Sequence, residues 1–150
     1  SLRAAQLVGL TSSLFISGIN FSAGHLTLPI LYRLPGGTAS DIFQELYFRG
    51  AWTVAPLAIL STLSSGTAAY LAGPGNTRLL WAAVGGATIS TQIWTAFFMM
   101  PTNNELIRIS QVPEGEKREE EAKKAGVNKL LRKWVWMNHV RAALAATGGL

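Results

Sequence analysis

The sequence predicts an all-α integral membrane protein, a four-helix bundle that forms one domain over residues 1–150. Two observations predict this fold class. Charged residues make up only 14% of the chain, against about 25% in soluble domains. Most of those charges lie between Asn104 and Trp134, which leaves long uncharged stretches elsewhere. Because about 20 apolar residues in a helix cross a bilayer core, each of these stretches is a candidate membrane span.

The first two spans are expected at residues 4–32 and 50–72. The first holds no charged residue and many glycines and serines, which let helices approach closely in lipid. Pro29 is expected to kink its end, and Pro35–Gly37 is a turn signal. The second span follows an aromatic, amphipathic segment and closes at Gly73–Asn76. These two spans therefore have clear boundaries.

The last two spans are expected at residues 79–100 and 130–150. Residues 79–100 lack any charge, and Pro101 is expected to stop or bend their helix. The polar connection 102–129 is dense in charges of both signs, which is typical of a solvated helix or loop without chemistry of its own. The fourth span is only just long enough to cross a bilayer.

Loop charge predicts how the bundle sits in the membrane. Lys and Arg concentrate in the connections after the first and third spans. The positive-inside rule therefore places these connections in the cytosol and both termini outside or in the lumen. We expect an integral protein of the endoplasmic reticulum or another internal membrane in a eukaryote, or of the plasma membrane in a bacterium.

Composition excludes several classes of function. The net charge is +5, but the basic residues share their connection with acids and form no basic face with interleaved aromatics. We therefore expect no nucleic-acid partner. The absence of cysteine excludes thiol chemistry, disulfides, iron–sulfur clusters and Cys-ligated zinc. Without a glycine-rich phosphate loop or a nucleotide fingerprint, a bound nucleotide or flavin is not expected.

Strong polar groups gather where the last span begins. Trp134, Asn138 and Arg141 fall at i, i+4 and i+7, so they share one helix face. His139 lies about 100° further round the helix. A second polar cluster, Pro101–Glu105, ends the preceding span. We expect the two clusters to meet at the same end of the bundle, and we place the candidate site there.

Arg141 lies about two turns inside its span, where a charge costs a few kcal/mol without a partner or a wet cavity. Three interpretations are open. The side chain reaches the headgroups, it pairs structurally with Glu45 or Glu105, or it binds an anionic or phenolic oxygen of a ligand.

His25 and His139 are the two histidines, and they are expected at similar depth. One of them fits the role of a general base at neutral pH. As a pair they fit the axial ligands of a haem held between helices. In the third interpretation each donates to a carbonyl of a neighbouring helix. A carboxylate-bridged di-iron site is excluded because the spans contain no acid, and we predict no metal site.

Aromatic and amide side chains complete the set of candidates. They form either a flat pocket for an aromatic ligand or an interfacial belt, and the amides either cap a helix or anchor polar edges of a ligand. The candidates are Tyr47, Trp52, Trp94, Trp134, Asn103 and Asn104.

A family resemblance is carried by two motifs. Met100–Leu106 reads Met-Pro-Thr-Asn-Asn-Glu-Leu, and after a charged stretch Trp134–Arg141 reads Trp-x-x-x-Asn-His-x-Arg. Together they resemble the anthrone oxygenase-like family of small four-helix membrane proteins, and Gly18, Ser22 and Pro29 fit its first helix loosely. The resemblance implies oxidation of an anthrone to an anthraquinone with molecular oxygen and without flavin or nicotinamide.

The resemblance also implies roles for the candidate residues. His139 or His25 would be the base, and Arg141 with Asn138 and Asn103 would hold the developing phenolate. Trp134, Trp94 and Trp52 would sandwich the flat rings. The expected partners are an aromatic small molecule, O₂ and membrane lipid, with a homo-oligomer as a further possibility. Two alternatives stay open: a haem- or metal-assisted oxidoreductase, and a non-catalytic membrane subunit or lipid- or quinone-binding module.

Overall fold

The computed structural model describes residues 1–148, and within them the ordered segments are all helical. Two of the segments, η1 and η2, are wider π-helical turns. In chain order the elements are α1 (Leu2–Ser22), η1 (Ala23–Thr27), α2 (Leu28–Leu31), α3 (Gly36–Leu71), α4 (Asn76–Trp94), η2 (Thr95–Met99), α5 (Met100–Ser110), α6 (Glu116–Ala125) and α7 (Val127–Thr147).

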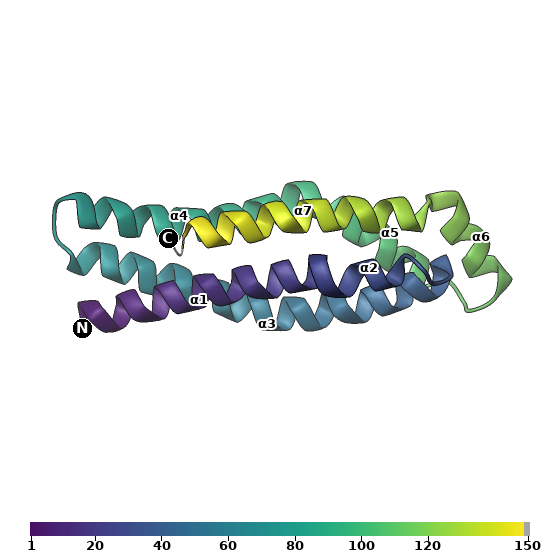
Figure 1. Cartoon of the computed structure of the whole chain (residues 1–150), viewed down its shortest axis with the longest axis horizontal. Helices are drawn as coiled ribbons and strands as arrows, with labels where there is room; N and C mark the ends of the chain where they lie inside the picture. Colours follow the sequence, from purple (N-terminus) through teal and green to yellow (C-terminus); the bar gives the residue numbers. More distant parts are fainter. Residues whose placement is uncertain (149–150) are drawn as a thin grey trace.

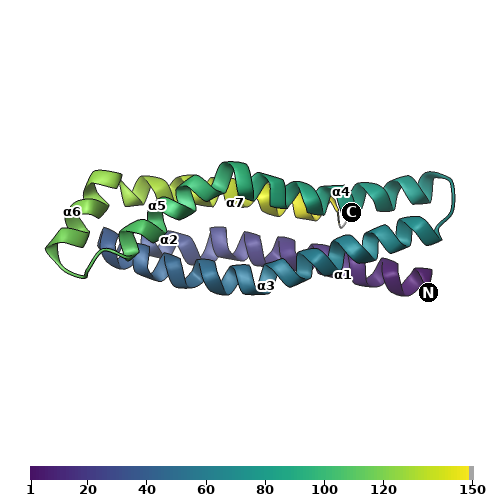
Figure 2. The ribbon, with the colours of Figure 1, turned by 180° about the vertical axis from the view of Figure 1, so that it is seen from behind.

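The long helices run side by side along one axis and form an elongated bundle (Figure 1). α1 with its continuation α2 lies along α3, and α4 with its continuation α5 lies along α7 (Figures 1 and 2). The short α6 covers one end, which we call the loop end. The N-terminus and the α3–α4 turn lie at the opposite end. The predicted all-α bundle is thus confirmed.

The helices extend further than the expected spans. α3 begins at Gly36, directly after Pro35, so the aromatic segment expected before the second span is part of the same helix. The third helix continues past Pro101 to Ser110. α7 is described to Thr147, and the expected end of the fourth span at residues 149–150 lies outside the described residues.

The interior changes character along the bundle. Near the loop end, large apolar side chains such as Phe43, Leu106 and Leu131 are almost fully buried. Towards the other end, hydroxyl groups take their place: Ser13 donates to the Ala145 carbonyl over 2.7 Å, from α1 to α7. Small residues and interhelical hydrogen bonds are how helices associate in lipid, where burial of apolar side chains supplies little driving force.

Large apolar side chains face outwards on every long helix, and examples are Leu7, Phe15, Ile59, Leu63, Leu79, Phe97 and Trp136. A monomeric soluble protein rarely exposes so much continuous apolar surface. Two helices of the described chain, Leu2–Leu31 and Gly36–Leu71, are long and apolar enough to cross a membrane. The fold is therefore consistent with a helical membrane bundle.

Both π-helical turns precede a proline by two residues. η1 ends at Thr27 before Pro29, and η2 ends at Met99 before Pro101. A proline ring clashes with the carbonyl four residues earlier, which in both cases lies inside the π-helical turn. The wider turn accommodates the ring while the helix continues. Pro101 thus does not stop its helix, and both prolines follow a widened turn. Such π-helical turns are frequent at functional sites.

Candidate functional site

A cavity of about 240 Å³ lies inside the bundle between α1, α3, α4 and α7. This is close to the lower end of the range for small-molecule pockets, about 300 Å³. Both π-helical turns contribute to its wall, through Ala23 and Thr95. The other lining residues are Ile19, Asn20, Leu28, Phe43, Leu46, Tyr47, Gly50, Ala51, Val54, Ala55, Gln92, Asn103, Trp134 and Arg141.

Arg141 is held in the wall of this cavity by three side chains. Its Nη2 donates to Asn20 Oδ1 over 2.9 Å and to Asn138 Oδ1 over 2.6 Å. Its Nη1 donates to Thr95 Oγ1 over 3.4 Å. Asn138 in turn donates through Nδ2 to the Asn20 backbone carbonyl. The guanidinium is therefore positioned by α1, η2 and α7 together, and all three of these acceptors are uncharged oxygens.

Two hydrogen-bond donors in the wall of this cavity have no acceptor among the described residues. Arg141 Nε and Asn20 Nδ2 are buried without a partner in the described residues, and both residues line the cavity. A buried donor left unpaired costs about 1–3 kcal/mol, and more when it is charged. The cavity is therefore suited to a ligand that brings an oxygen acceptor, above all an anionic one.

The two acids considered from the sequence as partners for Arg141 pair with other arginines. Glu45 pairs with Arg49, and Glu105 pairs with Arg108 over 2.8 Å. Among the described residues that line the cavity there is no Asp or Glu. The interpretation of Arg141 as a structural ion pair with Glu45 or Glu105 is thus wrong.

The two polar clusters predicted from the sequence do meet. Trp134 Nε1 on α7 donates to Asn103 Oδ1 on α5 over 2.8 Å. The Trp134 ring packs edge-on against Phe43, with ring centroids 5.5 Å apart and an interplanar angle of 85°. The Tyr47 hydroxyl donates to the weak acceptor Met100 Sδ over 3.6 Å. The cavity thus combines an aromatic wall with a phenolic hydroxyl opposite the polar cluster.

The two histidines do not line the cavity. His25 is exposed and stacks on Phe21, with ring centroids 5.1 Å apart. His139, on α7, packs against the same Phe21 ring, with ring centroids 5.8 Å apart. Its Nε2 is buried without a partner beside Gly24, where a Cβ atom would approach it to 2.9 Å. The imidazoles therefore lie at the α1–α7 contact rather than at the guanidinium.

Three other predicted residues also lie away from the cavity. Trp52 is 81% exposed, as expected for an interfacial or lipid-facing tryptophan. Trp94 donates through Nε1 to the Met137 carbonyl over 3.1 Å and stacks on Phe98. Asn104 is exposed on α5. Of the three tryptophans predicted to hold aromatic rings, Trp134 alone lines the cavity in the described structure.

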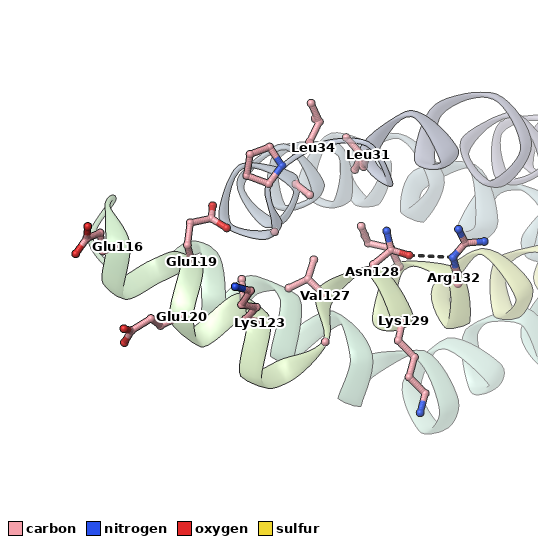
Figure 3. A pocket seen from close by; sticks show the side chains of 16 residues that line it. Leu31, Leu34, Glu116, Glu119, Glu120, Lys123, Val127, Asn128, Lys129 and Arg132 are labelled. Carbon is pink, nitrogen blue, oxygen red and sulfur yellow. Dashed lines mark hydrogen bonds between the residues drawn. The ribbon is translucent and has the colours of Figure 1, made fainter.

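A second, more open hollow of about 1050 Å³ lies at the loop end, between α2, α3, α6 and α7 (Figure 3). Its rim carries both signs of charge. Several of its polar groups are already paired: Glu119 Oε1 accepts from the Gly37 backbone N–H over 2.9 Å, and Arg132 Nε donates to Asn128 Oδ1 over 2.9 Å. The first contact ties α6 to α3 and the second lies within α7, and we interpret the hollow as a structural junction.

Sequence reasoning missed Asn20, Thr95 and Phe43 as members of the site. Asn20 had one signal, because an amide in the middle of an otherwise apolar span is rarely without a partner. Thr95 and Phe43 had none, since hydroxyl and aromatic residues are common throughout these helices. The spacing of residues within α7 could not reveal which residues of α1 and α3 face it.

Comparison with known proteins identifies the family of the chain. The family model for anthrone oxygenase matches residues 43–150, a range that includes Tyr47, Asn103, Trp134 and Arg141. The chain belongs to the anthrone oxygenase family. An anthrone oxygenase of Claviceps purpurea (strain 20.1) is 27% identical over 150 residues, covering 97% of this chain and 84% of the relative. No solved structure matches the chain. The family match begins after α1, whereas the match to the Claviceps purpurea relative covers nearly the whole chain.

Proposed function

We propose that the protein is a membrane-embedded oxygenase that oxidises an anthrone-like or hydroquinone-like polycyclic aromatic to the quinone with O₂. The observation that carries the proposal is the half-buried Arg141, which lines a cavity without a carboxylate partner among the described residues. Membership of the anthrone oxygenase family supports the reaction class. The partly aromatic lining suits a flat substrate.

The reaction needs no atoms besides those of substrate and oxygen. The ring methylene of an anthrone loses a proton to give an electron-rich anthranolate. The anthranolate transfers one electron to O₂, and the two radicals combine at the former methylene carbon as a peroxide, which takes up a proton. Loss of water from the hydroperoxide leaves the second carbonyl of the quinone. In sum, one CH₂ group and one O₂ become one C=O group and one water.

Arg141 and Asn20 fit the part of this reaction that needs stabilisation. A phenolate or enolate oxygen would accept from Arg141 Nε and Asn20 Nδ2, two donors of the cavity wall that have no partner among the described residues. Donors fixed in a water-poor site are worth a few kcal/mol to a developing oxyanion. Asn138 keeps the guanidinium in place, and Asn103 does the same for Trp134.

The proton that leaves the substrate needs a path out of the cavity. Tyr47 is the lining residue whose hydroxyl can pass a proton on, and the proposal gives it that role. His139 remains in the proposal only as an indirect acceptor, because its ring lies beside Asn138 on the α1–α7 contact. His25 has no role in this scheme.

The proposal includes no flavin, nicotinamide or haem. It is supported by the lack of a phosphate-binding loop in the sequence and by the position of His25 and His139, neither of which faces the cavity. The haem alternative requires both imidazoles to turn towards one iron, whereas both rings pack against Phe21.

The test is oxidation of emodin anthrone under air by the purified, detergent-solubilised protein, followed by quinone absorbance with a spectrum of the same sample. The proposal predicts quinone formation above the autoxidation rate and no Soret or flavin band. A Soret band together with activity would favour the haem alternative. Binding of the quinone without any acceleration would favour a quinone-binding module in the same cavity.

A further inference from the structure

The cavity around Arg141 opens through the side of the bundle, and we propose that the substrate enters by this opening directly from the bilayer. The opening, here called the side mouth, is framed by Gly50, Ala51 and Ala55 of α3 and by Gln92 of α4. The ligand class is a flat, apolar aromatic that carries an acidic hydroxyl. The inference rests on the proposed function and adds a route to it.

Exposure locates the side mouth. Ala51, Ala55 and Gln92 all line the cavity, yet all three are exposed at the protein surface. A residue that is both exposed and cavity-lining lies where the cavity reaches the outside. Since α3 and α4 run side by side on this part of the bundle (Figure 2), the opening lies between these two helices.

The α3 side of the mouth is built from small residues. Gly50, Ala51, Val54 and Ala55 fall at i, i+1, i+4 and i+5, so they share one strip of the helix. A Cβ atom built on Gly50 would meet no other atom within 4 Å, which shows that the space beside it is open. No large side chain of α3 crosses the mouth within this strip.

The mouth leads to polar groups that have no partner. Asn20 is 1% exposed, and its Nδ2 is an unpaired donor in the cavity wall. Arg141 Nε is buried and unpaired in the same wall. A stripe of small residues on its own would be ordinary helix packing. Here the small residues line the same cavity as the buried donors Asn20 Nδ2 and Arg141 Nε, so they frame a path to a binding site.

The helices that frame the mouth also carry exposed apolar side chains. Ile59 on α3, Ile93 on α4 and Phe98 on η2 are each more than half exposed, at 62%, 52% and 55%. Such side chains are compatible with lipid and unfavourable in water. A ligand that arrives through this surface is therefore dissolved in the bilayer, and its apolar rings pass the small residues before its hydroxyl meets Arg141.

The loop-end hollow does not offer a second route. It shares no lining residue with the cavity. Its floor includes Leu31, Ala39 and Leu131, which are only 4%, 1% and 1% exposed. One helical turn deeper, Leu28, Phe43 and Trp134 form the near wall of the cavity. Two buried layers thus separate the charged hollow from the Arg141 site.

The experiment measures how fast 1,8-dihydroxyanthraquinone, a stable product-like probe, binds to the protein in phosphatidylcholine vesicles. Gly50→Leu and Ala55→Phe place a larger side chain in the mouth. Gly66→Leu is the matched control for the first, because Gly66 lies on the same helix, is exposed and also has open space around it. Ala83→Phe, on an exposed position of α4 that does not line the cavity, is the control for the second.

We expect the two mouth variants to lower the association rate constant at least tenfold and the two controls to stay within twofold of wild type. Wild-type association rates in both mouth variants would overturn the route, and so would weaker affinity at an unchanged association rate, which would place these residues inside the site instead. Circular dichroism confirms that each variant is folded. Wild-type protein that binds the probe but does not oxidise emodin anthrone would refute the proposed function while leaving the route intact.

Discussion

Arg141 on α7 donates to the side-chain oxygen of Asn20 on α1 over 2.9 Å, and this hydrogen bond joins the last helix to the first across the cavity. The two residues also hold the unpaired donors of the site, Arg141 Nε and Asn20 Nδ2. An uncharged oxygen orients the guanidinium without cancelling its charge. The charge of Arg141 is therefore left for a ligand.

Replacing Asn138 with aspartate tests whether the uncompensated charge matters. Asn138 Oδ1 accepts from Arg141 over 2.6 Å, so Asn138→Asp places a carboxylate of nearly the same shape against the guanidinium. We expect binding of an anionic or phenolic ligand to weaken at least tenfold, because Arg141 then has a partner of its own. Titration with 1,8-dihydroxyanthraquinone measures the effect. Unchanged affinity in Asn138→Asp would argue against an anion-binding Arg141.

Substitution of the histidines distinguishes the proposed mechanism, in which Arg141 stabilises the substrate anion, from one that uses a haem or a histidine as the direct base. His25 is exposed and lies outside the cavity, so His25→Ala should keep oxidation of emodin anthrone within about twofold of wild type. His139→Gln should have a smaller effect on kcat than any change of Arg141. If His25→Ala instead abolishes oxidation, a mechanism that uses both imidazoles becomes the better account.

Gly24 permits the close contact between η1 and α7. A Cβ atom there would lie 2.9 Å from His139 Nε2 and 3.4 Å from Asn138 Nδ2. Gly24→Ala should therefore push α7 away and destabilise the fold by about 1–3 kcal/mol, the usual cost of overpacking. Gly18→Ala on the neighbouring helix meets nothing within 4 Å and should be neutral or stabilising. Thermal unfolding in detergent compares the Gly24→Ala and Gly18→Ala variants. Equal Tm values would contradict the tight contact between η1 and α7 at Gly24.

The ion pair of Glu105 and Arg108 predicts a dependence of stability on pH. The hydrogen bond from Arg108 holds the pKa of Glu105 below its ordinary value of 4.5, against the opposing effect of burial. A carboxyl group whose pKa is lowered by folding stabilises the folded state above its unfolded pKa, and this contribution is lost as the pH falls through the folded pKa. The effect should be small because the pair is exposed. Tm measured from pH 7 down to pH 3 should fall less steeply in Glu105→Gln than in wild type; parallel curves would contradict the assignment.

Much of the fold and part of the site could be predicted from the sequence. Uncharged stretches located the long helices, because charge is costly in a bilayer. Helical spacing correctly placed Trp134, Asn138 and Arg141 on one inward face, and all three are buried or half-buried. The polar cluster after Pro101 meets α7 through Asn103 and Trp134, as expected.

What could not be predicted depends on contacts between helices. Spacing along α7 does not say which face of α1 lies opposite, so it could not identify Asn20 as a partner of Arg141. The π-helical turns follow from packing around Pro29 and Pro101, and the sequence suggested only kinks or stops there. His139, about 100° round the helix from Arg141, proved to face η1 instead of the cavity. An angular difference of about 100° around a helix is enough to turn a side chain from a cavity towards a neighbouring helix.

The most direct test of the central claim is the rate of emodin anthrone oxidation by wild type and Arg141→Met in the same phosphatidylcholine vesicles, with O₂ uptake recorded. Met keeps much of the side-chain volume and removes the charge. The account predicts one O₂ consumed per quinone formed by wild type, and a loss of about 10²–10³ in kcat for Arg141→Met, the usual cost of removing an oxyanion donor. Wild-type rates in a folded Arg141→Met protein would contradict the claim that Arg141 carries the reaction.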